Sequence, residues 1–373
     1  MQKLTTTLSF SEEQTMLLET AENFFRERTP VTGVRDLMLS THGYQPEIWQ
    51  EMIALGWTGL AIAEEYGGSG LNLAAATCIA EPMGRYLSAT PWLSTQLAIQ
   101  GLMAADESLQ SEFLPQIAEG AAATVALTEI DASWDLTAAQ LKVERQNGQV
   151  LLSGTKTFVL NADVAQIALV SGICDGELCL VVLNADEIAA AQPTRETVID
   201  ETRRSFELRC DGLSVDAGRL LVDVHAQQAC ARIEAAALLL LSAEAAGGIA
   251  GVLEVIVEYL NTREAFGRKI GGYQGLKHPT VDILIGLERT RSHVYHAASL
   301  LDAGEDASLA LRMAKAEASA SFAFAGDRAV QFHGGFGFTW DCDAQLYLRR
   351  ALWSQYMFGD AIYHRKHLSE ALL

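Results

Sequence analysis

The spacing of apolar residues changes twice along this chain of 373 residues, and this change limits the possible folds more than any other feature. Helical spacing prevails up to about residue 120, strand-like alternation fills residues 121–225, and helical spacing returns from residue 226 onward. We therefore predict an α+β protein with an N-terminal helical domain (1–120), a middle antiparallel β domain (121–225) and a C-terminal helical bundle (226–373).

The helical segments carry signals for where helices begin and end. Ser11 stands three residues before Gln14, which is the spacing of a capping box. Pro46 precedes a helical pattern over Glu47–Leu55, and the glycines of Tyr66–Gly70 indicate a loop. In the last third of the chain the helical spacing is clearest in five apolar residues: Ile249, Val252, Leu253, Ile256 and Leu260.

Two turn dipeptides divide the middle segment into hairpins. Asn147-Gly148 stands between two strand-like runs, and this dipeptide is the strongest short-range hairpin signal. Asp175-Gly176 stands between the apolar runs Ile167–Cys174 and Leu178–Leu183, which predicts a second hairpin. Residues 213–224 are expected to add further strand.

Charge and cysteine content narrow the class of function. A formal net charge of -20 argues against nucleic acid or an anionic membrane surface as a main partner. None of the six cysteines forms a C-x-x-C pair or a cluster with zinc spacing, so we expect reduced thiols and no metal site. The N-terminus lacks a long apolar segment, and the most apolar run, Ala235–Ala243, is shorter than the roughly 20 residues of a membrane span. We expect a soluble, cytoplasmic protein.

Five short motifs occur in order along nearly the whole chain. They are Leu55-Gly-Trp57 with Glu64–Gly70, Thr128-Glu129, Gly154-Thr-Lys-Thr-Phe158, Arg263-Glu-Ala-Phe266-Gly267 with Gln274, and Gln331-Phe-His-Gly334-Gly335-Phe-Gly-Phe-Thr339. In this order and spacing they resemble the motifs of the acyl-CoA dehydrogenase family. Each motif alone is weak, whereas five in sequence are specific.

The resemblance implies a fold and a reaction. The fold is an N-terminal helical domain, a middle β domain and a C-terminal four-helix bundle, with FAD bound at a subunit interface. The reaction is the desaturation of an acyl-CoA thioester between Cα and Cβ. Electrons would then leave through an electron-transfer flavoprotein, or pass to oxygen if the site is oxidase-like.

The resemblance assigns FAD binding to eight residues: Arg263, Phe266, Gln274, Gln331, Gly334, Gly335, Thr128 and Phe158. In this role the forked guanidinium of Arg263 suits a pyrophosphate, and adjacent glycines let the backbone approach a phosphate closely. Taken singly, Arg263 also fits a surface ion pair with Glu258 or Glu264, and Gly334-Gly335 also fits a plain turn between helices.

The half of the site that would hold the flavin ring departs from the family pattern. Ser133 stands where the family has a glycine, and Trp134 stands where it has a small hydroxyl residue that reaches phosphate. Leu160 replaces a threonine that hydrogen-bonds the flavin near N5, while Phe158 can still cover the ring. Trp134 fits either a core position or an obstruction of the flavin pocket.

The catalytic base is missing from its usual positions. Phe358 stands where many relatives carry a glutamate, and phenylalanine cannot accept a proton, although its backbone N–H could polarise a thioester carbonyl. The second location used in the family falls near Ala237, which is not acidic either. The carboxylates of Glu234, Glu244 and Asp360 lie nearby and are candidate bases. Each also fits an ordinary structural role, Asp360 as a helix N-cap.

Three functions follow from this pattern. The first is a subunit of a heteromeric acyl-CoA dehydrogenase whose related partner chain supplies the base, as in bacterial relatives that act on bulky or steroid acyl-CoA thioesters. The second is a self-sufficient homotetrameric dehydrogenase with a relocated base. The third is a structural subunit without flavin. In the first two, the chain binds FAD and acyl-CoA as an oligomer.

Overall fold

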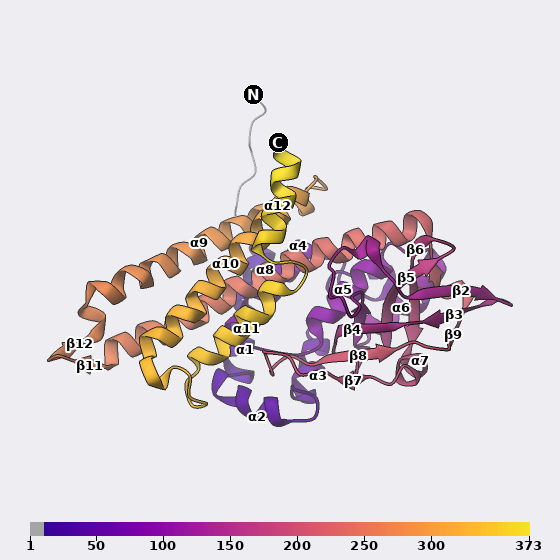
Figure 1. The fold of residues 1–373 in the computed structure, drawn as a ribbon. Helices are drawn as coiled ribbons and strands as arrows, with labels where there is room; N and C mark the ends of the chain where they lie inside the picture. The colour runs from indigo at the N-terminus through magenta and orange to yellow at the C-terminus, as the bar shows by residue number, and fades with distance from the viewer. Residues whose placement is uncertain (1–10) are drawn as a thin grey trace. The chain divides into compact units, whose positions relative to one another are not determined.

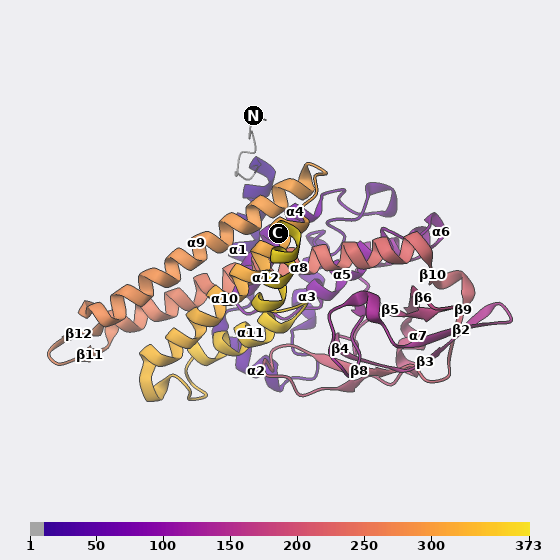
Figure 2. The ribbon, with the colours of Figure 1, turned by 45° about the horizontal axis from the view of Figure 1, so that its top comes forward.

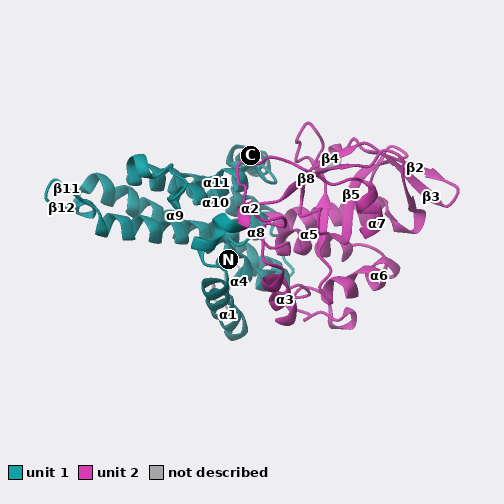
Figure 3. Cartoon of the chain, turned by 90° about the horizontal axis from the view of Figure 1, so that it is seen from below, with its two compact units in different colours: residues 1–36, 72–88, 238–373 teal, residues 37–71, 89–237 magenta. Residues whose placement is uncertain are grey.

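The computed structural model describes residues 11–373 and contains two compact units (Figure 3). Unit 1 comprises Met1–Asp36, Asn72–Ser88 and Leu238–Leu373, and unit 2 comprises Leu37–Leu71 and Ala89–Ala237. The prediction that no targeting signal is present concerns residues 1–7, which lie outside the described residues. The boundaries of the three expected domains stay a prediction, since each unit combines separate stretches of the chain.

Unit 1 is helical, and its longest helices run alongside one another (Figures 1 and 2). Helix α10 packs against α9, α11 and α12, while α4 packs against α1 and α9. The helices are α1 (Glu12–Arg28), α4 (Leu73–Arg85), α8 (Asp223–Thr262, from Leu238 onward in this unit), α9 (Gln274–Asp302), α10 (Ser308–His333), α11 (Ala344–Tyr356) and α12 (Ala361–Leu372). The small hairpin of β11 (Glu264–Ala265) and β12 (Arg268–Lys269) joins α8 to α9.

Unit 2 combines helices with two sheets. One sheet has seven strands, β1 (Ala123–Ala126), β2 (Lys142–Gln146), β3 (Gln149–Ser153), β5 (Ile167–Cys174), β6 (Glu177–Asn184), β9 (Leu213–Asp216) and β10 (Leu220–Leu221). The other has three, β4 (Thr155–Leu160), β7 (Thr194–Arg195) and β8 (Ser205–Arg209). The helices are α3 (Pro46–Ala54), α5 (Trp92–Leu102), α6 (Glu107–Ala118), α7 (Ala185–Ala190) and the first part of α8, up to Ala237. The short α2 (Val34–Leu39) crosses from unit 1 to unit 2 in the sequence.

Most of the local predictions are confirmed. Ser11 and Gln14 form the reciprocal capping box of α1, with both hydrogen bonds at 3.1 Å. Asn147-Gly148 and Asp175-Gly176 are the two-residue turns of the β2–β3 and β5–β6 hairpins, and all four residues have positive φ, as a type I′ turn requires. The α+β class is therefore confirmed.

Most strand pairs of the large sheet are antiparallel, as predicted, but two pairings with β5 are parallel. β1 pairs parallel with β5 at Ala123–Ala126, and β2 pairs parallel with β5 at Lys142 and Val143. Both strands reach the edge of β5 through connections longer than a turn, so no local dipeptide marks their partner. Residues 213–224 also hold less strand than expected, because β9 and β10 are short and α8 begins at Asp223.

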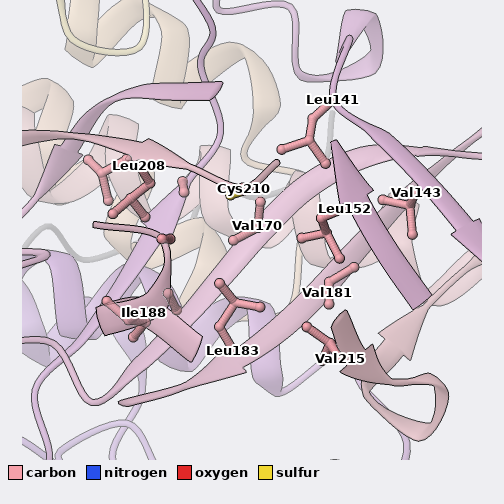
Figure 4. Packing of buried hydrophobic residues seen from close by; sticks show 14 of the residues in the cluster. Leu141, Val143, Leu152, Val170, Val181, Leu183, Ile188, Leu208, Cys210 and Val215 are labelled. Carbon is pink, nitrogen blue, oxygen red and sulfur yellow. The ribbon is translucent and has the colours of Figure 1, made fainter. Parts of the chain in front are cut away.

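The hydrophobic core of unit 2 lies against the strands of its two sheets (Figure 4). Val143 of β2 and the alternate residues Val150 and Leu152 of β3 point into it, and β5 and β6 are buried along most of their length. Labelled members include Leu141, Val143, Leu152, Val170, Val181, Leu183, Ile188, Leu208, Cys210 and Val215. Helix α8 is long and apolar enough to cross a membrane by length and composition. However, 94% of its apolar 18-residue window is buried, as in a core helix.

Candidate functional site

An exposed aromatic residue marks the end of α8 in unit 1. The hairpin after the helix turns at Phe266 and Gly267, which both have positive φ. An aromatic residue in this region of backbone space is strained, and the Phe266 side chain is 97% exposed. Neither packing nor backbone preference explains phenylalanine here, which favours a role in contacting a ligand or another chain.

The polar residues near this hairpin point to solvent. Arg263 follows the last residue of α8, and its backbone N–H donates to the Tyr259 carbonyl at 2.9 Å. Its guanidinium forms no ion pair or hydrogen bond with residues 11–373, because Glu264 pairs instead with Lys269 at 2.8 Å. Gln274, the first residue of α9, and Gln331, near the end of α10, are likewise exposed.

The end of α10 lies against the end of α8. The His333 ring stacks on Tyr259 with centroids 4.1 Å apart, and its Nδ1 is 2.7 Å from the Ala329 carbonyl oxygen. Gly334 then adopts φ 60° and ψ -141°, a conformation that only glycine tolerates. No atom lies within 4 Å of where a Cβ on Gly334 or Gly335 would stand, so their backbone is open to a ligand.

These residues fit the adenosine and pyrophosphate end of FAD. They offer an unpaired guanidinium, an aromatic face, two side-chain amides and bare backbone at one end of the bundle. All of them are exposed, so unit 1 alone would leave such a cofactor largely in solvent. A second surface is needed to cover it.

Unit 2 carries the two residues expected near the flavin ring. Thr128 is buried and its hydroxyl donates to the Thr157 carbonyl at 2.7 Å, which leaves lone pairs that can still accept a hydrogen bond. Phe158 lies in β4 at a positive φ of 55°, and its side chain is 37% exposed. Leu160 is buried and Trp134 is half-buried. Phe158 can therefore cover a flat ring, whereas Leu160 offers no hydrogen bond.

A buried ion pair that the sequence did not indicate supports this region. Lys156 Nζ donates to Glu129 Oε1 at 2.5 Å and to Ser171 Oγ at 2.9 Å. Burial lowers the pKa of Lys156, and the partner carboxylate of Glu129 opposes that shift. Glu129 also accepts the backbone N–H groups of Gln140 and Leu141, both at 3.0 Å. The network fixes Thr128 and β4 relative to each other.

The three candidate bases have different surroundings. Glu244 is buried, and its Oε1 accepts a hydrogen bond from Arg350 Nη1 at 2.5 Å. Asp360 is the N-cap of α12, where its Oδ1 accepts the Tyr363 N–H at 2.8 Å. Glu234 belongs to the part of α8 in unit 2 and is half-buried. Glu244 and Asp360 thus have the structural roles that were the alternative to catalysis.

Buried basic residues hold the loop around Phe358. Phe358 is 5% exposed and has a φ of 57°, and its carbonyl oxygen lies 2.9 Å from His364 Nε2. Lys315 donates to the carbonyl oxygens of Ser354 and Gly359, both at 3.1 Å. The loop is therefore well anchored, and it places a buried aromatic side chain where the family pattern has a proton acceptor.

Comparison with known proteins identifies the family. The family described as "Acyl-CoA dehydrogenase, N-terminal domain" matches residues 11–121, and "Acyl-CoA dehydrogenase, C-terminal domain" matches residues 231–373. Acyl-CoA dehydrogenase IpdE2 of Mycolicibacterium smegmatis is 30% identical over 353 residues, which cover 94% of this chain and 95% of that protein. This chain belongs to the acyl-CoA dehydrogenase family. It is an oxidoreductase of that type, and the cofactor of the family is FAD.

Two solved structures share the fold of this acyl-CoA dehydrogenase. A chain of the ChsE4–ChsE5 complex from Mycobacterium tuberculosis has a TM-score of 0.89 and 21% identity, and the match covers 98% of each chain. A variant of the Tcur3481–Tcur3483 steroid ACAD has a TM-score of 0.86 and 25% identity, again over 98% of each chain. The predicted family fold is confirmed over nearly the whole chain.

Proposed function

We propose that this chain is one subunit of a heteromeric acyl-CoA dehydrogenase and that the catalytic base lies on a related partner chain. The observation that carries the proposal is the set of contacts that the candidate carboxylates make. Phe358 fills the usual position of the base, Glu244 is bound to Arg350, and Asp360 caps α12. A carboxylate held in a buried ion pair is poorly placed to take a proton from a substrate.

The binding residues of this chain would serve the partner's cofactor. Arg263, Phe266, Gln274, Gln331 and Gly334-Gly335 hold the adenosine and pyrophosphate end of an FAD whose ring lies in the partner. Their exposure supports this division, because a neighbouring chain would cover them. When bound, FAD supplies the hydride acceptor for α,β-desaturation. Thr128 and Phe158 are the residues of this chain that would face a flavin of its own.

The substrate we propose is a bulky acyl-CoA thioester such as a steroid-derived one. The support is the name of one structural neighbour, a steroid ACAD, which is 25% identical to this chain. We further propose an electron-transfer flavoprotein as the acceptor and the cytoplasm as the location. All six cysteines are buried and free, which suits a reducing compartment.

The self-sufficient homotetramer is the second candidate, and Asp360 is the observation that keeps it open. This carboxylate follows the usual base position by two residues and is only partly buried. Asparagine is as good an N-cap as aspartate, so Asp360→Asn removes the base without removing the cap.

The decisive experiment compares the chain produced alone with the chain co-expressed with any related chain that is encoded beside it. We expect a colourless chain alone, and a yellow complex that reduces an artificial electron acceptor in the presence of steroid acyl-CoA. Asp360→Asn, Glu244→Gln and Glu234→Gln should leave the activity of the complex within a few-fold. A loss of about a hundredfold or more with flavin retained is the size expected for removing a general base, and it would move the base to this chain. A yellow, active homotetramer would favour the second candidate, and lasting absence of flavin would favour a structural subunit.

A further inference from the structure

Strand β4 is distorted where it carries the ring-covering phenylalanine. β4 pairs antiparallel with β8, and the register shifts between Lys156 and Val159 (the strands are labelled in Figure 1). Phe158 lies in this irregular stretch with a positive φ of 55°. A phenylalanine persists in such a conformation only where the surroundings hold it there.

One side of this bulge is held by the buried network. Lys156 is bound to Glu129 and Ser171, and the Thr157 hydroxyl donates to the Glu129 carbonyl at 2.9 Å. These contacts fix the two residues before Phe158. They do not reach the backbone N–H of Phe158 itself.

The other side is held by Glu196. Its Oε2 accepts the backbone N–H of Phe158 at 3.0 Å and the hydroxyl of Ser205 at 2.7 Å. The backbone N–H of Glu196 donates to the Ser205 carbonyl at 2.9 Å, which extends the β7–β8 pairing by one residue. Glu196 is thus bound to Ser205 twice, once through its backbone N–H and once through its carboxylate.

We propose that Glu196 is a positioning residue that fixes the Phe158 ring in the orientation in which it covers the flavin. The inference rests on one part of the proposed function, namely that Thr128 and Phe158 face a flavin bound by this chain itself, in addition to the partner's FAD. A charged acceptor is suited to this task, because hydrogen bonds to an ionised group are shorter and stronger than neutral ones. Alanine at position 196 would leave the bulge held from one side only.

The test uses the full-length chain in the co-expressed complex. Glu196→Ala removes the acceptor, Glu196→Gln keeps an oxygen acceptor without the charge, and Ser205→Ala removes only the second donor. Glu207→Ala is the matched control, because Glu207 lies on the adjacent strand β8 and pairs with Arg209. Amide hydrogen exchange resolved at Phe158 reads the contact directly, and the visible absorbance band of the flavin reads the ring position.

We expect exchange at Phe158 to accelerate about tenfold or more in Glu196→Ala, the size expected for losing a hydrogen bond to a charged group. Ser205→Ala and Glu207→Ala should change it less than threefold, and Glu196→Gln should restore much of the protection. The flavin band should shift in Glu196→Ala and return in Glu196→Gln. Unchanged exchange in Glu196→Ala would overturn the contact, and faster exchange with an unchanged flavin band would overturn the positioning role. A wild-type complex without flavin would instead overturn the proposed function. One flavin for each pair of chains, with its ring in the partner, would leave no flavin against Phe158 and would overturn the role of Glu196 alone.

Discussion

The pairing of Glu244 with Arg350 determines how a change at either residue will act. Both side chains are buried, and the hydrogen bond between them is 2.5 Å long. Removing one partner leaves the other charge buried without compensation, which costs about 3–5 kcal/mol. Glu244→Leu and Arg350→Met are each expected to lower the free energy of unfolding in urea by that amount. The double variant should lose much less than the sum, and strictly additive losses would contradict the pairing.

Lys315 should make stability depend on pH. Burial lowers its pKa from the ordinary 10.5 to about 7. Between these values the unfolded chain binds one proton more than the folded chain, so the free energy of unfolding rises with pH. The contribution of Lys315 approaches about 1.4 kcal/mol per pH unit in this range.

Urea unfolding at pH 7 and pH 8.5 measures this slope. Both pH values lie below the ordinary thiol pKa of 9.0, at which the cysteines of the unfolded chain ionise. Lys315→Met should be less stable than the wild type, because it leaves the carbonyl oxygens of Ser354 and Gly359 without their donor. It should also lack the rise between the two pH values. The same rise in both proteins would assign it to another group.

At the scale of single residues, the sequence predicted roles that depend on near neighbours. The capping box at Ser11 and the alternative role of Asp360 as an N-cap were both predicted from residues within one helical turn. The partner of Glu244 could not be predicted, because Arg350 lies 106 residues away and either residue alone fits a solvated surface. The same holds for Glu196 and Phe158, which are 38 residues apart.

At the scale of elements, helices α4 and α8 cross so closely that only glycine fits between them. A Cβ on Gly247 would stand 1.7 Å from the Glu81 carbonyl oxygen, and a Cβ on Gly84 would stand 1.8 Å from that of Glu244. Gly247→Ala must therefore push the helices apart, and overpacking of this kind costs typically about 1–3 kcal/mol. Gly275→Ala in α9 is the control, because nothing lies within 4 Å of its Cβ position. Alanine there should stabilise the helix slightly, and equal effects of the two changes on the melting temperature would contradict the close crossing.

The sequence predicted elements better than their partners. Asn147-Gly148 and Asp175-Gly176 identify their hairpins because a two-residue turn fixes which strands pair. The parallel pairing of β1 and β2 with β5 depends on the tertiary fold and left no such signal. The glycines of α8 likewise gave no local signal, since Gly247 lowers helix propensity and is explained only by the helix that crosses it.

At the scale of the whole molecule, the residues that match the family's FAD motifs divide between two kinds of surroundings. Thr128 and the network beneath Phe158 are buried within unit 2, whereas Arg263, Phe266, Gln274 and Gln331 are exposed in unit 1. Motif matching predicted both sets, but it carries no information on exposure. Our proposal that a neighbouring chain covers the exposed set follows from this difference, because a cofactor bound only to a solvated surface would lose most of its binding energy to water.

Arg263 offers the sharpest test of that requirement. Its guanidinium is exposed and unpaired within residues 11–373, so Arg263→Ala should leave folding unchanged. If it binds the pyrophosphate of the partner's FAD, its loss removes a charge-assisted contact worth roughly 1.5–3 kcal/mol, and FAD affinity should fall about tenfold to a hundredfold. Arg268→Ala is the matched control, since Arg268 lies on the same hairpin and stacks on Tyr273 at 3.9 Å. Flavin retention after dilution of the complex should fall for the first variant and not for the second. Equal retention in both would remove Arg263 from the cofactor site and, with it, the reason for placing a neighbour's FAD at this end of the bundle.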